Sequence, residues 1–191
     1  MEDVFDVLAQ DHEEIRQALA ELEKGPTAAT GATEDQLMLR TIMTEELVIE
    51  EVKHEEIELT CLWPAVREHV PGGAELADRA VCAELEIVAL LAELAKLDAS
   101  QPEFESLLSQ FARAAREHFG FEEQHVWPRL RSVIASGALP PKAAAELGRK
   151  VLLARQSGPG RSGPREPASP GPEWPQTSQW PGESAHYGSF G

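Results

Sequence analysis

Two stretches of the chain read HEEIELTCLWPAVR (residues 54–67) and HFGFEEQHVWPRLR (residues 118–131). Both fit the pattern His-x3-Glu-x4-Trp-Pro, and an Arg follows at the same distance in each. A His and a Glu four positions apart lie on one face of a helix, one turn from each other. Because Trp and His are rare, we interpret the match as an internal repeat. Two such helices facing each other would bring two imidazoles and two carboxylates to one point, which indicates a metal site.

A weaker repeat precedes each of these stretches. Residues 11–24 read DHEEIRQALAELEK and residues 83–96 read AELEIVALLAELAK, and in this register His12 falls opposite Glu84. The chain then consists of a helical hairpin used twice, over 1–68 and roughly 73–135. Helices rich in Leu, Ala, Glu and Lys also resemble one another by composition alone, so that alternative stays open for the first-helix match.

Composition and charge exclude several classes of function. The chain has 191 residues, 42% of them hydrophobic, and a net charge of −16. This predicts one domain with a real core, and it argues against nucleic acid or an anionic membrane surface as partner. No apolar run reaches the length of a membrane span, and the acidic start lacks the basic region of a signal peptide. Cys61 and Cys82 form no CxxC pattern, so we expect a reduced cytoplasmic protein with buried thiols.

Helical periodicity dominates the chain up to residue 156, and it predicts an all-α, up-down-up-down four-helix bundle with a short extra C-terminal helix. Residues 157–191 are rich in Pro, Gly and Ser and nearly free of aliphatic residues, which predicts a disordered tail. Its EWP and QWP motifs could dock a protein partner, although a loose tail is the simpler interpretation. Pro64 and Pro128 should kink or end the regular part of their helices. The expected helices run over about 3–24, 34–68, 74–98, 102–135 and 141–155, and Thr33 is the expected N-cap of the second.

The apolar stripe of each long helix is interrupted near its middle by His or Glu. A buried carboxylate without a partner costs on the order of several kcal/mol, and no Lys or Arg lies on these stripes at that level. A divalent or trivalent cation would compensate the charge. The metal-ligand candidates are His12, His54, Glu58, Glu84, His118 and Glu122.

Several neighbours of these candidates carry side chains that can bind metal or contact a ligand. Glu86 could replace Glu84, and Glu123 could replace Glu122. His125 is expected at the rim rather than behind a ligand, and Cys61 as a structural rather than a redox thiol. The acidic residues around His54 are expected on a solvated face; they are Glu50, Glu51 and Glu55. The two repeated tryptophans, Trp63 and Trp127, are expected to plug one end of the bundle.

These motifs resemble the hemerythrin-like, HHE cation-binding family over about residues 1–135. The resemblance rests on Asp11-His12-Glu13 and on the two His-x3-Glu motifs with their Trp-Pro pairs. It implies a four-helix bundle with a non-haem di-iron centre, two oxo- or hydroxo-bridged irons, that binds or reacts with dioxygen, peroxide or nitric oxide. It also implies that Glu58 and Glu122 bridge the metals and that the histidines are terminal ligands.

The chain departs from the respiratory members at two places. Glu84 and Val88 stand where those proteins have two histidines, and His118-x3-Glu122 stands where they have His-x4-Asp. The site would be richer in oxygen ligands, with an open position beside Val88, which argues against reversible oxygen carriage and favours oxidative chemistry. We therefore expect a di-iron protein that binds, senses or reacts with a small ligand. The alternatives are a di-iron oxidoreductase that consumes peroxide or oxidises iron, and a cation store or a bundle that holds zinc or one metal.

Overall fold

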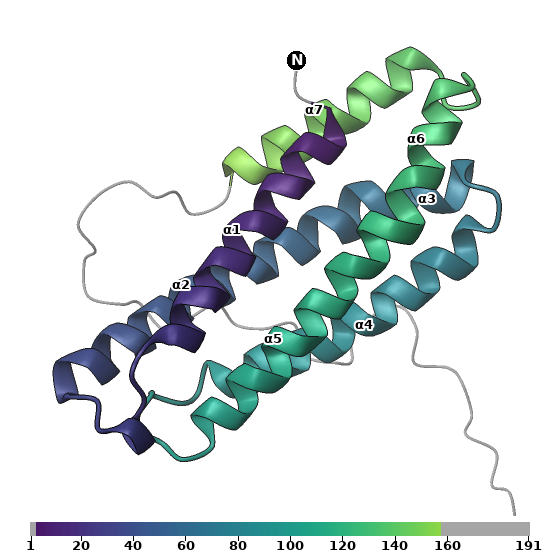
Figure 1. The fold of residues 1–191 in the computed structure, drawn as a ribbon. Coiled ribbons are helices and arrows are strands. Elements are labelled where there is room, and N and C mark those ends of the chain that lie inside the picture. Colours follow the sequence, from purple (N-terminus) through teal and green to yellow (C-terminus); the bar gives the residue numbers. More distant parts are fainter. Residues whose placement is uncertain (1–2, 158–191) are drawn as a thin grey trace, which may run out of the picture. The chain divides into compact units, whose positions relative to one another are not determined.

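The structure, a computed structural model, describes residues 3–157, and every regular element in that range is helical (Figure 1). The prediction of an all-α fold is confirmed. The predicted tail over 157–191 lies outside the described residues except for Ser157, which ends helix α7 instead. The helices are α1 (Val4–Lys24), α2 (Glu34–Ile57), α3 (Trp63–His69), α4 (Gly73–Leu94), α5 (Phe104–Phe121), α6 (Trp127–Ala135) and α7 (Pro141–Ser157), with a 3-10 turn η1 (Ala28–Thr30) and two π-helical turns η2 (Glu58–Leu62) and η3 (Glu122–Val126).

Capping side chains define where the first two long helices begin. Asp3 and Asp6 form a reciprocal capping box at α1, and Thr33 and Gln36 form another at α2. Each box satisfies backbone N–H groups that have no partner inside the helix. The prediction of Thr33 as an N-cap is therefore confirmed. The predicted helix over 74–98 ends earlier, because Ala95 caps α4 and the chain turns towards Pro102.

The long helices pack around one interior (Figure 1). Helix α1 lies against α2 and α5, α4 lies against α5 and α2, and α3 lies against α4 and α6. Helix α7 packs across α1, α2 and η2. No helix within residues 3–157 is both long enough and apolar enough to cross a membrane.

The interior consists of two apolar clusters. One includes Leu8, Leu62 and Leu130, and the other includes Leu19, Leu91 and Phe111. Along α1 the first cluster takes residues 4–8 and the second takes residues 15–22, so that position 12 falls between them. The same break occurs at position 84 of α4. The interruptions of the apolar stripes thus lie at one level, which we call the polar layer.

Both helices that carry the His-x3-Glu motif contain a π-helical turn. Each turn begins at the motif's glutamate, Glu58 or Glu122, and ends just before Trp-Pro. A proline inside a helix lacks an N–H and its ring clashes with the carbonyl four residues earlier. The wider turn accommodates the proline, and the helix then continues as α3 or α6. The predicted kink is therefore a π turn, a feature that often accompanies functional sites.

A tight turn connects α3 to α4. Gly72 has φ of 71°, in the left-handed region that favours glycine. A Cβ on Gly73 would lie 2.0 Å from the carbonyl oxygen of Val66. The Gly72-Gly73 pair therefore lets the chain reverse closely enough for α4 to pack on α3.

Candidate metal centre

The structure brings the six candidate ligand residues together in the polar layer. Each of them is buried, and the most exposed is Glu84, at 5%. They come from α1, α2, η2, α4, α5 and η3. Their donor atoms fall into two groups, in each of which all the atoms lie within 4.8 Å of one another.

The first donor group consists of His12, His54, Glu58 and Glu122. The Nε2 atoms of His12 and His54 lie 3.1 Å apart. Oε2 of Glu122 lies 3.1 Å from His12 Nε2, and Oε1 of Glu58 lies 3.5 Å from His54 Nε2. Donors that bind one metal at about 2.0–2.2 Å stand roughly 3–4 Å from each other. The spacing therefore suits a cation held by two nitrogens and two oxygens.

The second donor group consists of Glu55, Glu58, Glu84 and His118. The Nε2 atom of His118 lies 3.5 Å from Oε2 of Glu58, 3.9 Å from Oε2 of Glu55 and 4.0 Å from Oε1 of Glu84. Oε1 of Glu122 also lies 3.5 Å from this nitrogen. This group has one nitrogen and as many as four carboxylates around it.

Two glutamates connect the groups. Glu58 directs Oε1 to His54 and Oε2 to His118, and Glu122 directs Oε2 to His12 and Oε1 to His118. Each carboxylate thus offers one oxygen to each group. This arrangement suits carboxylates shared between two cations, and each of the two residues begins a π turn.

The buried carboxylates have histidines as their only charged partners among the described residues. Both oxygens of Glu51, Glu55, Glu58 and Glu122 are buried without a hydrogen-bond partner among the described residues. Within the same part of the chain, no Lys or Arg forms an ion pair with any of the four. A buried ionised carboxylate is costly unless a counter-charge lies nearby. The residues therefore fit a multivalent cation, which would satisfy the oxygens and neutralise the charge.

Without metal, burial keeps several of these carboxyl groups protonated. It raises the pKa of Glu51 to about 7 and that of Glu84 to about 8. Burial and neighbouring carboxylates raise the pKa values of Glu55 and Glu122 well above the usual value. Metal binding would reverse this and release protons.

The histidines respond to burial in opposite ways. Burial lowers the pKa of His12 to about 4. For His54 burial also acts to lower the pKa, but Glu58, Asp11 and Glu51 outweigh it and raise the pKa to about 9. Burial acts to raise the pKa of Glu58, but the neighbouring histidines lower it to about 2. Glu58 and His54 therefore form an ion pair in the metal-free site.

The outer nitrogens of two histidines face carboxylates. His12 Nδ1 lies 2.8 Å from Oε1 of Glu123. The same oxygen forms an ion pair with Nη2 of Arg16, also at 2.8 Å. His54 Nδ1 lies 3.7 Å from Oδ2 of Asp11. A carboxylate behind a metal-binding imidazole fixes the ring's orientation and raises its basicity. Glu123 therefore stands behind a ligand candidate, and Glu122 stands in the donor groups.

The two repeated tryptophans, which were expected to plug one end of the bundle, are buried in the apolar cluster on one side of the polar layer and contact that layer. The indole N–H of Trp63 donates a hydrogen bond to Oε1 of Glu84. The ring of Trp127 stacks on His12, with centroids 5.0 Å apart. Phe119 stacks on the same imidazole, at 4.1 Å. The π turns bring the tryptophans to this position, because each turn ends immediately before one.

Other expectations are corrected by burial. Glu51 and Glu55 were expected on a solvated face, but they are 0% and 5% exposed. Their spacing is a signal that could have revealed them, since positions 47, 51, 55 and 58 share one helical face. The expectation of buried thiols is wrong, because Cys82 is exposed and Cys61 is half-buried. Glu50, Glu86 and His125 are exposed.

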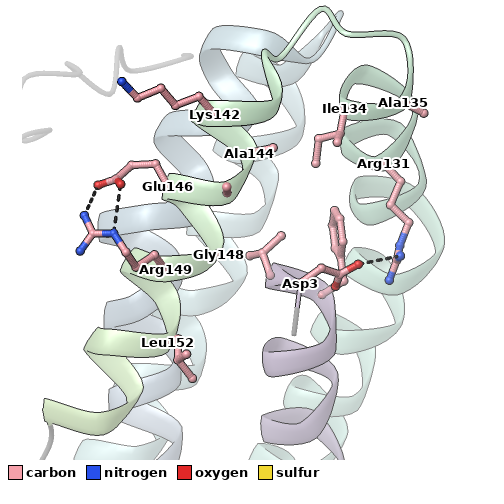
Figure 2. A pocket seen from close by; sticks show the side chains of 13 residues that line it. Asp3, Arg131, Ile134, Ala135, Lys142, Ala144, Glu146, Gly148, Arg149 and Leu152 are labelled. Atoms are coloured by element: carbon pink, nitrogen blue, oxygen red, sulfur yellow. Dashed lines mark hydrogen bonds and ion pairs between the residues drawn. The ribbon is translucent and has the colours of Figure 1, made fainter. Parts of the chain in front are cut away.

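A groove of about 720 Å³ lies between the start of α1, helix α6 and helix α7 (Figure 2). Two ion pairs among its lining residues, Asp3–Arg131 and Glu146–Arg149, have lengths of 3.5 Å and 2.5 Å. Figure 2 marks both with dashed lines. None of the donor-group residues lines this groove. It is therefore separate from the candidate metal centre.

Comparison with known proteins agrees with this class of all-helical protein with a buried His/Glu centre. The model of the hemerythrin HHE cation-binding domain family matches residues 3–130, so the chain belongs to this family. A crystal structure of a hemerythrin HHE cation-binding domain-containing protein from Mycobacterium kansasii is similar in fold, with a TM-score of 0.63 and 21% sequence identity. The match covers 82% of this chain and 90% of that one. No curated protein matches the chain.

Proposed function

We propose that the protein is a non-haem di-iron protein whose centre binds or reacts with a small ligand: dioxygen, peroxide or nitric oxide. The observation that carries the proposal is the pair of donor groups that share Glu58 and Glu122. A single bound metal would not require two carboxylates that each direct one oxygen to each donor group. Family membership supports a cation as the occupant.

In this proposal His12 and His54 are terminal ligands of one iron, and His118, Glu84 and Glu55 are terminal ligands of the other. Glu58 and Glu122 would be shared between the two sites, with one oxygen for each. Glu55 was absent from the ligand set expected from the sequence, and its place in the second donor group adds it. The centre lies in an up-down-up-down bundle formed by α1, α2 with α3, α4, and α5 with α6.

The two irons would differ in their surroundings. The second donor group has one imidazole and up to four carboxylates, whereas the first has two imidazoles. Anionic oxygen ligands stabilise ferric iron more than neutral nitrogens do. Iron supplies redox chemistry and ligand binding when it is present. The chain would hold it, and the stacked rings of Phe119 and Trp127 would shield the His12 side from solvent.

The oxygen-rich second group favours one further function, a di-iron oxidoreductase that consumes peroxide or oxidises iron. A third function, a cation store or a bundle with zinc or one metal, is less compatible with the two shared carboxylates. The buried donor groups and the acidic net charge support a small ligand rather than nucleic acid as the partner. We propose the cytoplasm as the location.

Optical spectroscopy tests the proposal. Anaerobically loaded ferrous protein is exposed to dioxygen, to peroxide and to nitric oxide in separate samples. We expect charge-transfer absorption of an oxo- or hydroxo-bridged ferric pair after oxidation, and a distinct ferrous spectrum with nitric oxide. Oxygen release from peroxide with many turnovers would assign the oxidoreductase function. Tight binding of zinc with no spectral response of the iron form would contradict the proposal.

A further inference from the structure

Helix α7 brings an arginine to the outer side of the polar layer. Leu147 and Val151 anchor the helix in the apolar cluster that also contains Val4 and Leu8. One turn further on, Arg155 reaches α1 and is only partly exposed. Its Nε atom lies 2.5 Å from Oδ1 of Asp11.

The rest of this guanidinium is also held by α1. Nη1 lies 3.1 Å from Oε1 of Gln10, and Nη2 lies 3.1 Å from Oε1 of Glu14. Three donors of a rigid fork therefore engage three side chains of one helical segment. Such a fork fixes direction as well as charge, which a lysine in the same place would not do.

The other oxygen of Asp11 faces the metal centre. Oδ2 lies 3.7 Å from His54 Nδ1, within ion-pair distance but just beyond hydrogen-bond length, and both atoms are buried without a hydrogen-bond partner in the described chain. The Nε2 atom of the same ring faces His12 and Glu58. Asp11 thus stands between Arg155 and His54, with one oxygen towards each.

A second arrangement of the same kind stands behind the other imidazole of the first donor group. Arg16 holds Glu123, and Glu123 accepts from His12 Nδ1. In contrast, His118 Nδ1 has no hydrogen-bond partner within residues 3–157. Both imidazoles of the first donor group therefore have an arginine-held carboxylate behind them, and that of the second has none.

We propose that Arg155 is a positioning residue for the metal centre: it orients Asp11, and through Asp11 it sets the direction of the His54 ring. Helix α7 lies beyond residues 3–130, which the family model matches, so Arg155 reaches the centre from outside the matched segment. The effect on metal rests on the proposed function, whereas the orientation of the ring does not.

The test compares Arg155→Ala, Arg155→Lys and a control, Arg149→Ala. Arg149 lies on the same helix, but its ion pair is with Glu146 three residues away. The first measurement uses metal-free protein and follows the side-chain N–H proton of the His54 ring by NMR. We expect a slowly exchanging Nδ1–H signal in the wild type and in Arg149→Ala. It should be lost in Arg155→Ala and weakened in Arg155→Lys, since the fork is absent.

The second measurement is the affinity for ferrous iron at the first donor group. Removing a carboxylate partner behind a ligand weakens metal binding about 10–100-fold. We expect about a tenfold loss in Arg155→Ala and in Asp11→Asn. The double variant should lose no more than Asp11→Asn alone, because the arginine acts through the aspartate.

Several results would overturn the proposal. One is a His54 N–H signal and an iron affinity that stay at the wild-type level in Arg155→Ala. Another is additive losses in the double variant, which would mean that Arg155 only stabilises the fold. If the wild type bound no iron, the proposed function would fail, and the NMR signal of the metal-free variants would still decide whether Arg155 orients His54. If Arg155→Ala did not fold, Arg155→Lys would supply the comparison.

Discussion

The indole N–H of Trp63 donates a hydrogen bond to the carboxylate of Glu84. Trp63 belongs to the first hairpin of the internal repeat and Glu84 to the second, so the bond joins the two halves across the polar layer. The equivalent tryptophan, Trp127, stacks instead on His12, and its indole N–H has no hydrogen-bond partner in the described residues. The two tryptophans therefore occupy equivalent positions in the repeat but make different interactions, a hydrogen bond for Trp63 and ring stacking for Trp127.

This difference gives a matched pair of substitutions. Trp63→Phe removes a bond that favours the ionised form of Glu84, so the pKa of Glu84 should rise further. We expect weaker binding of iron at the second donor group, on the order of tenfold, as measured by anaerobic titration. Trp127→Phe keeps an aromatic ring against His12 and loses no protein partner, so its affinity should stay near that of the wild type. Equal losses in the two variants would point to packing rather than to the bond.

Glu84 and Glu86 separate the two possible registers of the third long helix. Glu84 is buried in the second donor group and Glu86 is exposed. Glu84→Ala should weaken one metal position, leaving the other occupied in metal analysis, and Glu86→Ala should change little. Glu84→His should be tolerated and should disfavour ferric iron, because a neutral nitrogen replaces an anionic oxygen. Loss of metal in Glu86→Ala alone would show that the ligand comes from the other face.

The metal-free protein should become less stable as the pH rises from about 5 to about 8. Glu51 and Glu84 have pKa values of about 7 and about 8, above the usual 4.5, so the folded state holds protons that the unfolded state releases. His54, with a pKa of about 9, likewise stabilises the fold below 6.5 and loses this contribution as the pH rises through 9. All three effects have the same sign, and they outweigh the opposite effect of His12, whose pKa is lowered to about 4.

Urea unfolding at several pH values measures this dependence. Glu51→Gln should flatten the slope near pH 7, since an amide does not titrate. Iron should reverse the trend, because it binds the deprotonated ligands. A metal-free protein that grew more stable between pH 6 and pH 8 would be inconsistent with buried protonated carboxyl groups.

Deleting residues 158–191 should leave the helical bundle folded and able to bind metal. The segment has almost no aliphatic residues and follows the end of α7. Circular dichroism and metal analysis of the truncated protein measure the outcome. A marked loss of helical signal or of bound iron would mean that the segment packs on residues 3–157.

Much of the centre could be predicted because its pattern is local. His and Glu four apart share a helix face, and the repeat of rare residues places His54 with His118 without knowledge of the packing. The π turns could not be predicted, since they depend on how each helix relaxes around Pro64 or Pro128. Glu55 looked like a solvated residue because only the neighbouring α4 and α5 decide that its face is buried. Asp11 and Arg155 come together through α7, whose position no local pattern indicates.

Metal stoichiometry tests the central claim most directly. Metal-free wild-type protein, His54→Ala and His118→Ala would be titrated anaerobically with ferrous iron, and bound iron would be counted after desalting. Because the two donor groups share Glu58 and Glu122, we expect two irons per chain in the wild type. Each variant should lose stoichiometric binding, since each lacks an imidazole from a different group. One iron per chain in the wild type, or two retained in both variants, would contradict a carboxylate-bridged pair at this site.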